Sequence, residues 1–138
     1  MEGPHPHPLP GGEGEKALVE AAGRYRGNAV SGRSGFSVGA AIEDESGKIW
    51  GGCNVENSTY GLTVCAERVA IWKALSEGVR KFRAVAVVTG ADTPTPPCGA
   101  CRQILWEFAG DVPIVMATTA GARKRFQLSD LFPEPFDF

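Results

Sequence analysis

Histidine is almost missing from the sequence: the chain has two, His5 and His7, both in a stretch rich in proline and glycine. This composition suits neither a helix nor a strand, so residues 1–14 are expected to form a disordered tail. Residues 15–138 then form a single domain, which is a usual domain length. Because that domain has no histidine, any acid–base chemistry in it must use carboxylates, thiols, lysine or tyrosine.

Long apolar runs and blocks of like charge are missing as well. No stretch approaches the roughly 20 apolar residues of a membrane span, and the start lacks the charged and apolar regions of a signal peptide. We therefore expect a cytoplasmic protein with no membrane partner. The formal net charge is −2, and the basic residues at 80–83 and 123–125 form only short clusters. This balance favours a small, roughly neutral ligand over nucleic acid.

Helices and strands are predicted to alternate along the chain. Helices are expected at residues 15–28, 65–76 and 98–108, with Thr63 capping the second. Strands are expected at residues 36–42, 48–55, 82–89 and 112–117, with a weaker candidate at 125–128. The first two strands read as a hairpin, and helix-linked strands should pair in parallel. The pattern predicts an α/β fold, a three-layer α/β/α sandwich with a mixed central sheet of about five strands.

Three of the four cysteines lie at predicted helix starts. Cys98 and Cys101 form a C-x-x-C pair directly after Pro97, and Cys65 begins the preceding helix. In a reducing compartment, such spacing indicates metal ligands or catalytic thiols more often than disulfides. Three thiolates suit a catalytic zinc site, which leaves its fourth position to water. Arg68 and Arg102, each close behind a ligand, could support the thiolates by hydrogen bonding.

Glu67 follows Cys65 by two residues. A metal lowers the pKa of its bound water towards about 7, and a nearby carboxylate can accept that proton and return it to a leaving group. Two other interpretations remain open at this point. The C-x-x-C pair alone also suits a redox dithiol, although that chemistry needs no third cysteine. Cys53 could instead complete a closed four-thiolate zinc site in a non-catalytic module, which would leave Glu67 unexplained.

These residues match the pattern of the zinc deaminases, H-x-E followed by P-C-x-x-C, with cysteine allowed in place of histidine. Residues 17–136 resemble, more specifically, the small homotetrameric cytidine deaminases, with close matches at 52–57, 65–68 and 97–103. The resemblance implies one Zn²⁺ per chain and Glu67 as the proton shuttle. It also implies hydrolytic deamination of cytidine and deoxycytidine in pyrimidine salvage.

Several substrate contacts are implied by the same resemblance. Asn54 and Glu56 would hold the ribose hydroxyls, Phe36 would line the pyrimidine pocket, and the backbone N–H of Ala66 would address the edge of the base.

The resemblance further implies a homotetramer with composite active sites. Phe136 would pack over the substrate of a neighbouring subunit, and Tyr60 would likewise serve an adjacent site.

One stretch departs from the family pattern. Residues 29–36 read AVSGRSGF where the family usually has A-Y-x-P-Y-S-x-F, so Val30, Gly32 and Arg33 replace two aromatics and a proline. The pocket rim is therefore expected to be looser or more cationic. Two related activities stay open: deamination of a modified cytosine compound such as an aminoacyl nucleoside antibiotic, and editing of nucleic acid, which would need a basic channel.

Overall fold

The computed structural model describes residues 12–137. The elements, in chain order, are α1 (Glu13–Arg26), β1 (Val38–Asp44), β2 (Ile49–Cys53), the 3₁₀ helix η1 (Tyr60–Leu62), α2 (Ala66–Ser76), β3 (Phe82–Thr89), α3 (Gly99–Ala109), β4 (Pro113–Thr118), β5 (Arg123–Gln127) and α4 (Leu128–Leu131). Helix α1 begins at Glu13, two residues earlier than expected, because Glu13 and Glu15 occupy its first turn, where acidic residues are favourable. The expected tail covered residues 1–14: residues 1–11 lie outside the described residues, whereas Glu13 and Gly14 belong to α1.

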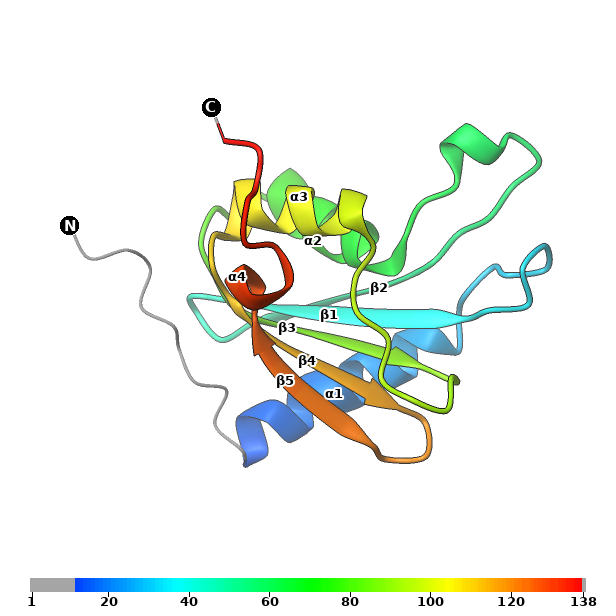
Figure 1. Ribbon diagram of the computed structural model, residues 1–138, viewed down its shortest axis with the longest axis horizontal. Coiled ribbons are helices and arrows are strands. Elements are labelled where there is room, and N and C mark those ends of the chain that lie inside the picture. Colours follow the sequence, from blue (N-terminus) through cyan, green and yellow to red (C-terminus); the bar gives the residue numbers. More distant parts are fainter. Residues whose placement is uncertain (1–11, 138) are drawn as a thin grey trace.

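One five-stranded sheet, in the order β2-β1-β3-β4-β5, forms the centre of the molecule. Strands β1 and β2 form the expected antiparallel hairpin, and β3 pairs with β4 in parallel. The parallel pair requires a crossover connection, which α3 supplies. Helix α1 covers one face of the sheet, while α2 and α3 cover the other (Figure 1). The expectation of a mixed sheet between two helical layers is therefore confirmed.

Each face of the sheet has its own hydrophobic core. Side chains alternate between the faces of a strand, so Ala84, Ala86 and Val88 of β3 pack towards α1, while Val85 and Val87 pack towards α2 and α3. The alanines leave room for α1 to lie close to the sheet.

Glu15 links α1 to the far edge of the sheet. It is only 1% exposed, and both Arg123 and Arg125 of β5 bind its carboxylate. The hydrogen bond from Arg125 lowers the pKa of Glu15 below its ordinary value, and the hydrogen bond from Arg123 adds to this effect. Together the two arginines outweigh burial, which raises the pKa. Two residues of the basic cluster at 123–125 are thus engaged within the fold.

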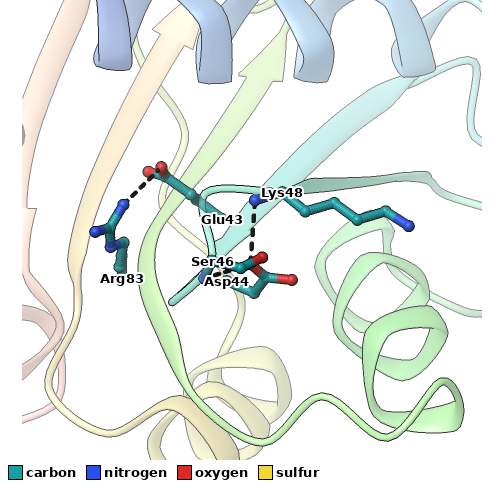
Figure 2. A network of polar contacts seen from close by, with 5 residues as sticks. All are labelled: Glu43, Asp44, Ser46, Lys48 and Arg83. Carbon is teal, nitrogen blue, oxygen red and sulfur yellow. Dashed lines mark hydrogen bonds and ion pairs between the residues drawn. The ribbon is translucent and has the colours of Figure 1, made fainter.

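Asp44 closes the turn between β1 and β2 (Figure 2). Its Oδ1 accepts hydrogen bonds from the backbone N of Ser46 at 2.8 Å, the Ser46 Oγ at 2.6 Å and the backbone N of Lys48 at 3.1 Å. Its Oδ2 accepts one from Trp50 Nε1 at 3.0 Å. Burial raises the pKa of Asp44, but these hydrogen bonds lower it more, to about 2. The neighbouring Glu43 forms an ion pair with Arg83.

We expect Asp44→Asn to lower the free energy of unfolding at pH 7 by about 1–2 kcal/mol, since an amide cannot accept from both the turn and Trp50. In the unaltered protein, unfolded Asp44 takes up a proton below about 3.8, whereas the folded form stays ionised down to about 2. Stability therefore falls as the pH falls through that window. Urea titrations at several pH values should show a weaker dependence in Asp44→Asn. Glu45→Gln, in the same turn, is the matched control; an equal loss in both variants would contradict this role.

Candidate active site

The starts of α2 and α3 bring three sulfurs together. Cys65 is the residue immediately before α2, Cys98 immediately precedes α3, and Cys101 lies in the first turn of α3. All three Sγ atoms lie within 4.8 Å of one another, and those of Cys65 and Cys98 are 3.9 Å apart. Sulfurs at Zn–S distances of about 2.3 Å in a tetrahedron would be about 3.8 Å apart. The donor set and its spacing therefore fit a zinc ion.

Helix α2 is held in place by direct contact with the sheet. A Cβ at Gly52 of β2 would lie 2.6 Å from the backbone N of Ala70 and 2.7 Å from the backbone O of Ala66. Only glycine permits that approach, because real Cβ atoms do not come so close. Gly52 thereby fixes the height of Cys65 and Glu67 above the sheet. The expected cap at Thr63 is wrong: Cys65 occupies the N-cap position, and Thr63 follows η1.

The pKa values of Cys65 and Cys101 shift in opposite directions. Hydrogen bonding from Cys101, together with Arg68, lowers the pKa of Cys65 to about 5, although burial opposes the shift. The pKa of Cys101 is raised, chiefly by its hydrogen bond to Cys65 and by burial. One negative charge is therefore accommodated readily, whereas further thiolates need a cation among the sulfurs.

Arg68 and Arg102 play different parts. Arg68 donates from Nη2 to the Sγ of Cys65 at 3.3 Å, and its guanidinium lies over the ring of Trp72. Arg102 was expected to support a thiolate in the same way. Instead it donates from Nε to the backbone O of Pro97 at 2.8 Å and from Nη1 to the backbone O of Leu131 at 2.6 Å. Over residues 12–137 no hydrogen bond joins Arg102 to a sulfur, so it braces the loop before Cys98.

Glu67 is a buried carboxylate beside these sulfurs. Its side chain lines the same cavity as Cys65 and Cys98, and the residue is 6% exposed. Burial raises the pKa of Glu67 to about 7, and the charge of Cys65 adds to that effect. A carboxyl group with this pKa can both accept and return a proton near neutral pH.

The cavity has a volume of about 280 Å³ and collects most of the expected substrate-binding residues. Phe36, Asn54, Glu56 and Ala66 all line it. Ala66 is the first residue of α2, so its backbone N–H lies where a helix offers no internal acceptor. Phe36 is 39% exposed, so part of this aromatic residue is open to solvent.

Tyr60 and Phe136 lie outside this cavity. Tyr60 borders a shallower pocket together with Arg33, whose guanidinium lies 5.6 Å from the centre of the Tyr60 ring. Phe136 borders a different pocket beside α3, and its backbone O accepts a hydrogen bond from Gln103. Neither residue is among those that line the cavity beside the sulfur cluster of its own chain.

The loop that contains Arg33 and Ser34 donates hydrogen bonds to the carboxylate of Glu56. The backbone N–H groups of Arg33 and Ser34 each donate to Oε1 at 3.0 Å, and Ser34 Oγ donates to Oε2 at 2.5 Å. Asn54 is 8% exposed and bridges to the same loop, accepting from the backbone N of Val38 and donating to the backbone O of Phe36. Sequence reasoning missed Ser34, although it matches the serine in the family's A-Y-x-P-Y-S-x-F stretch.

Cys53 does not join the sulfur cluster. It ends β2, opposite Gly39 of β1, and the group of sulfurs within 4.8 Å of one another across residues 12–137 consists of Cys65, Cys98 and Cys101. A closed site with four thiolates is therefore not what this arrangement provides.

Among residues 12–137, no helix combines the length and the apolar character needed to cross a bilayer.

Known proteins are similar to this chain in both sequence and fold. The family model for the cytidine and deoxycytidylate deaminase zinc-binding region matches residues 13–118. Cytidine deaminase from Sporosarcina psychrophila is 44% identical over 123 residues, which are 88% of this chain and 90% of that protein. The crystal structure of cytidine deaminase from Burkholderia pseudomallei has a TM-score of 0.85 at 43% identity, covering 88% of this chain and 98% of that one.

A more distant relative, blasticidin-S deaminase from Bacillus cereus, is 30% identical over 104 residues, 70% of this chain and 74% of that protein. The sulfur cluster, the buried carboxylate and the sheet that positions them thus occur together in a chain that matches one family over most of its length. The protein belongs to the family of zinc-binding cytidine and deoxycytidylate deaminases.

Proposed function

We propose that this protein hydrolyses cytidine and deoxycytidine to uridine and deoxyuridine, with release of ammonia, in pyrimidine salvage. The observation that carries the proposal is the carboxylate of Glu67, buried in the cavity next to three converging sulfurs. The relatives named above support the choice of a cytosine nucleoside.

Cys65, Cys98 and Cys101 would hold one Zn²⁺ per chain. When bound, the ion would act as a Lewis acid that lowers the pKa of a coordinated water to about 7. Arg68 would offset part of the negative charge of the three thiolates through its contact with Cys65.

Glu67 would move both protons of the reaction. It would first carry a proton from the attacking water to the ring nitrogen beside the amino-bearing carbon, which makes that carbon electrophilic as the water oxygen bonds to it. Glu67 would then carry the second proton from that oxygen to the amino group. The carbon–nitrogen bond breaks, ammonia leaves, and the oxygen remains as the carbonyl of the uracil ring. A pKa near 7 suits a group that must accept and donate in turn.

The rest of the cavity would hold the nucleoside. Phe36 would stack on the pyrimidine, the N–H of Ala66 would address its edge, and Asn54 and Glu56 would face the sugar. The basic clusters lie elsewhere: Arg83 pairs with Glu43, and Arg123 and Arg125 hold Glu15. This arrangement supports a free nucleoside over a nucleic acid as the substrate.

The direct test combines metal content with turnover. We expect about one zinc per chain in the purified protein and a loss of the cytidine absorbance band on incubation with cytidine. Blasticidin S and a cytosine-containing oligonucleotide are the comparison substrates. Selective action on either would replace the proposed substrate, and one zinc with no turnover of any cytosine compound would indicate a structural zinc module.

A homotetramer with shared active sites is proposed as the working form. Tyr60 is 75% exposed and Phe136 is 65% exposed, and neither is among the residues that line the cavity of its own chain, which supports a role at a neighbouring subunit. Light scattering should give a mass of four chains, and an active monomer would contradict the shared site. The cytoplasm is the proposed location, since its reducing conditions keep thiols available for metal binding.

A further inference from the structure

Ser34 connects the two parts of the cavity that would bind the nucleoside. Its backbone N and its Oγ both donate to the carboxylate of Glu56, at 3.0 and 2.5 Å. The same Oγ accepts a hydrogen bond from the backbone N of Phe36 at 3.0 Å. One side chain therefore joins the residue proposed for the sugar to the residue proposed for the base.

These contacts leave Glu56 with little spare capacity. A carboxylate offers about four lone-pair positions. Oε1 accepts from the backbone N–H groups of Arg33 and Ser34, and one position of Oε2 accepts from Ser34 Oγ. The remaining position of Oε2 faces only a long contact of 3.4 Å from Asn54 Nδ2. Glu56 can thus accept one further strong hydrogen bond, at a direction set by Ser34.

The hydrogen bonds from Ser34 also favour the ionised form of Glu56. The contact with Ser34 Oγ is the main cause of a lowered pKa for Glu56, and the backbone N–H groups of Ser34 and Arg33 add to it. Only the backbone of Arg33 takes part in these hydrogen bonds. The unusual side chain at this position therefore leaves the support of Glu56 intact.

We propose that Ser34 is a positioning residue that aims the carboxylate of Glu56 at a single ring hydroxyl of the nucleoside sugar. The inference rests on the proposed function. A hydroxyl donor would replace the long contact from Asn54, while Ser34 and the two backbone N–H groups hold the carboxylate still.

The test uses Ser34→Ala with cytidine, 2′-deoxycytidine, 3′-deoxycytidine and 2′,3′-dideoxycytidine. With cytidine, KM should rise about tenfold with little change in kcat, because a charge-assisted hydrogen bond that orients the carboxylate is lost. With 2′,3′-dideoxycytidine the variant and the unaltered protein should have nearly equal KM, since Glu56 then has no ring hydroxyl to bind. The two single deoxy compounds identify which hydroxyl is involved.

Two further variants keep the test sharp. Ser34→Thr retains the hydroxyl and should restore the KM for cytidine, and Ser37→Ala removes a hydroxyl of the same loop that bonds Ser31 rather than Glu56. An equal KM penalty on all four substrates, or no rescue by threonine, would overturn the inference while leaving the proposed function standing. No turnover of any of these nucleosides by the unaltered protein would overturn both.

Discussion

Glu67→Gln is expected to bind zinc as the unaltered protein does and to lose turnover of cytidine by about a thousandfold or more. Glutamine has nearly the same shape and fills the same buried position, so the three sulfurs keep their arrangement. It cannot accept a proton from water or return one to the amino group, however. Because both proton transfers are assigned to this one carboxylate, kcat should carry the loss.

The measurements are zinc per chain, the far-ultraviolet circular dichroism spectrum and kcat for cytidine. Glu77→Gln is the matched control, since Glu77 lies at the other end of the same helix and is exposed. It should retain full activity. A Glu67→Gln protein with near-normal kcat would remove the central step of the mechanism, and one that lost its zinc would show that Glu67 supports the metal site instead.

Cys98→Ala is expected to lower the affinity for zinc by at least about a hundredfold, and turnover should be lost with the metal. Cys98 is the exposed member of the cluster, so its replacement creates no cavity in the hydrophobic core. Only two sulfurs would remain, and the positive ends of the two helices and Arg68 cannot replace a ligand. The central sheet and the core between it and α1 should therefore persist.

Cys53→Ala is the matched control, because it removes a thiol that lies outside the cluster. Metal analysis after dialysis, followed by assay with added zinc, separates the two variants. Loss of zinc from Cys53→Ala would revive the closed site with four thiolates. Retention of zinc and activity by Cys98→Ala would exclude the assigned ligand set.

The sulfur cluster was predictable because its signals are local. Cys98 and Cys101 lie three positions apart, which places their side chains on one face of a helix, and Glu67 follows Cys65 so closely in the chain that the two must be near neighbours. The alternation of helices and strands then predicted the parallel pairing of β3 and β4. That topology brings the starts of α2 and α3 together.

Several of the contacts that sequence reasoning missed span long separations. Glu15 meets Arg125 across 110 positions of the chain, and Arg102 reaches the carbonyl of Leu131. No periodicity or spacing reports such pairs. The position of Arg102 next to Cys101 suggested a hydrogen bond to a sulfur. Its side chain instead donates to backbone carbonyls. The partners of Glu56 were hidden for the same reason, since they come from a loop more than 20 residues away.

Neither helix that begins at the sulfur cluster has an ordinary start. Serine, threonine, aspartate or asparagine usually occupies the position before a helix and bonds its free N–H groups. Here Cys65 and Cys98 hold those positions, and neither side chain makes such a bond to its own helix. The two helices thus give up local stabilisation at the ends that face each other. A bound metal would join the starts of α2 and α3 to each other. The order of these two helices would therefore depend on whether the site is occupied, whereas the order of the sheet would not.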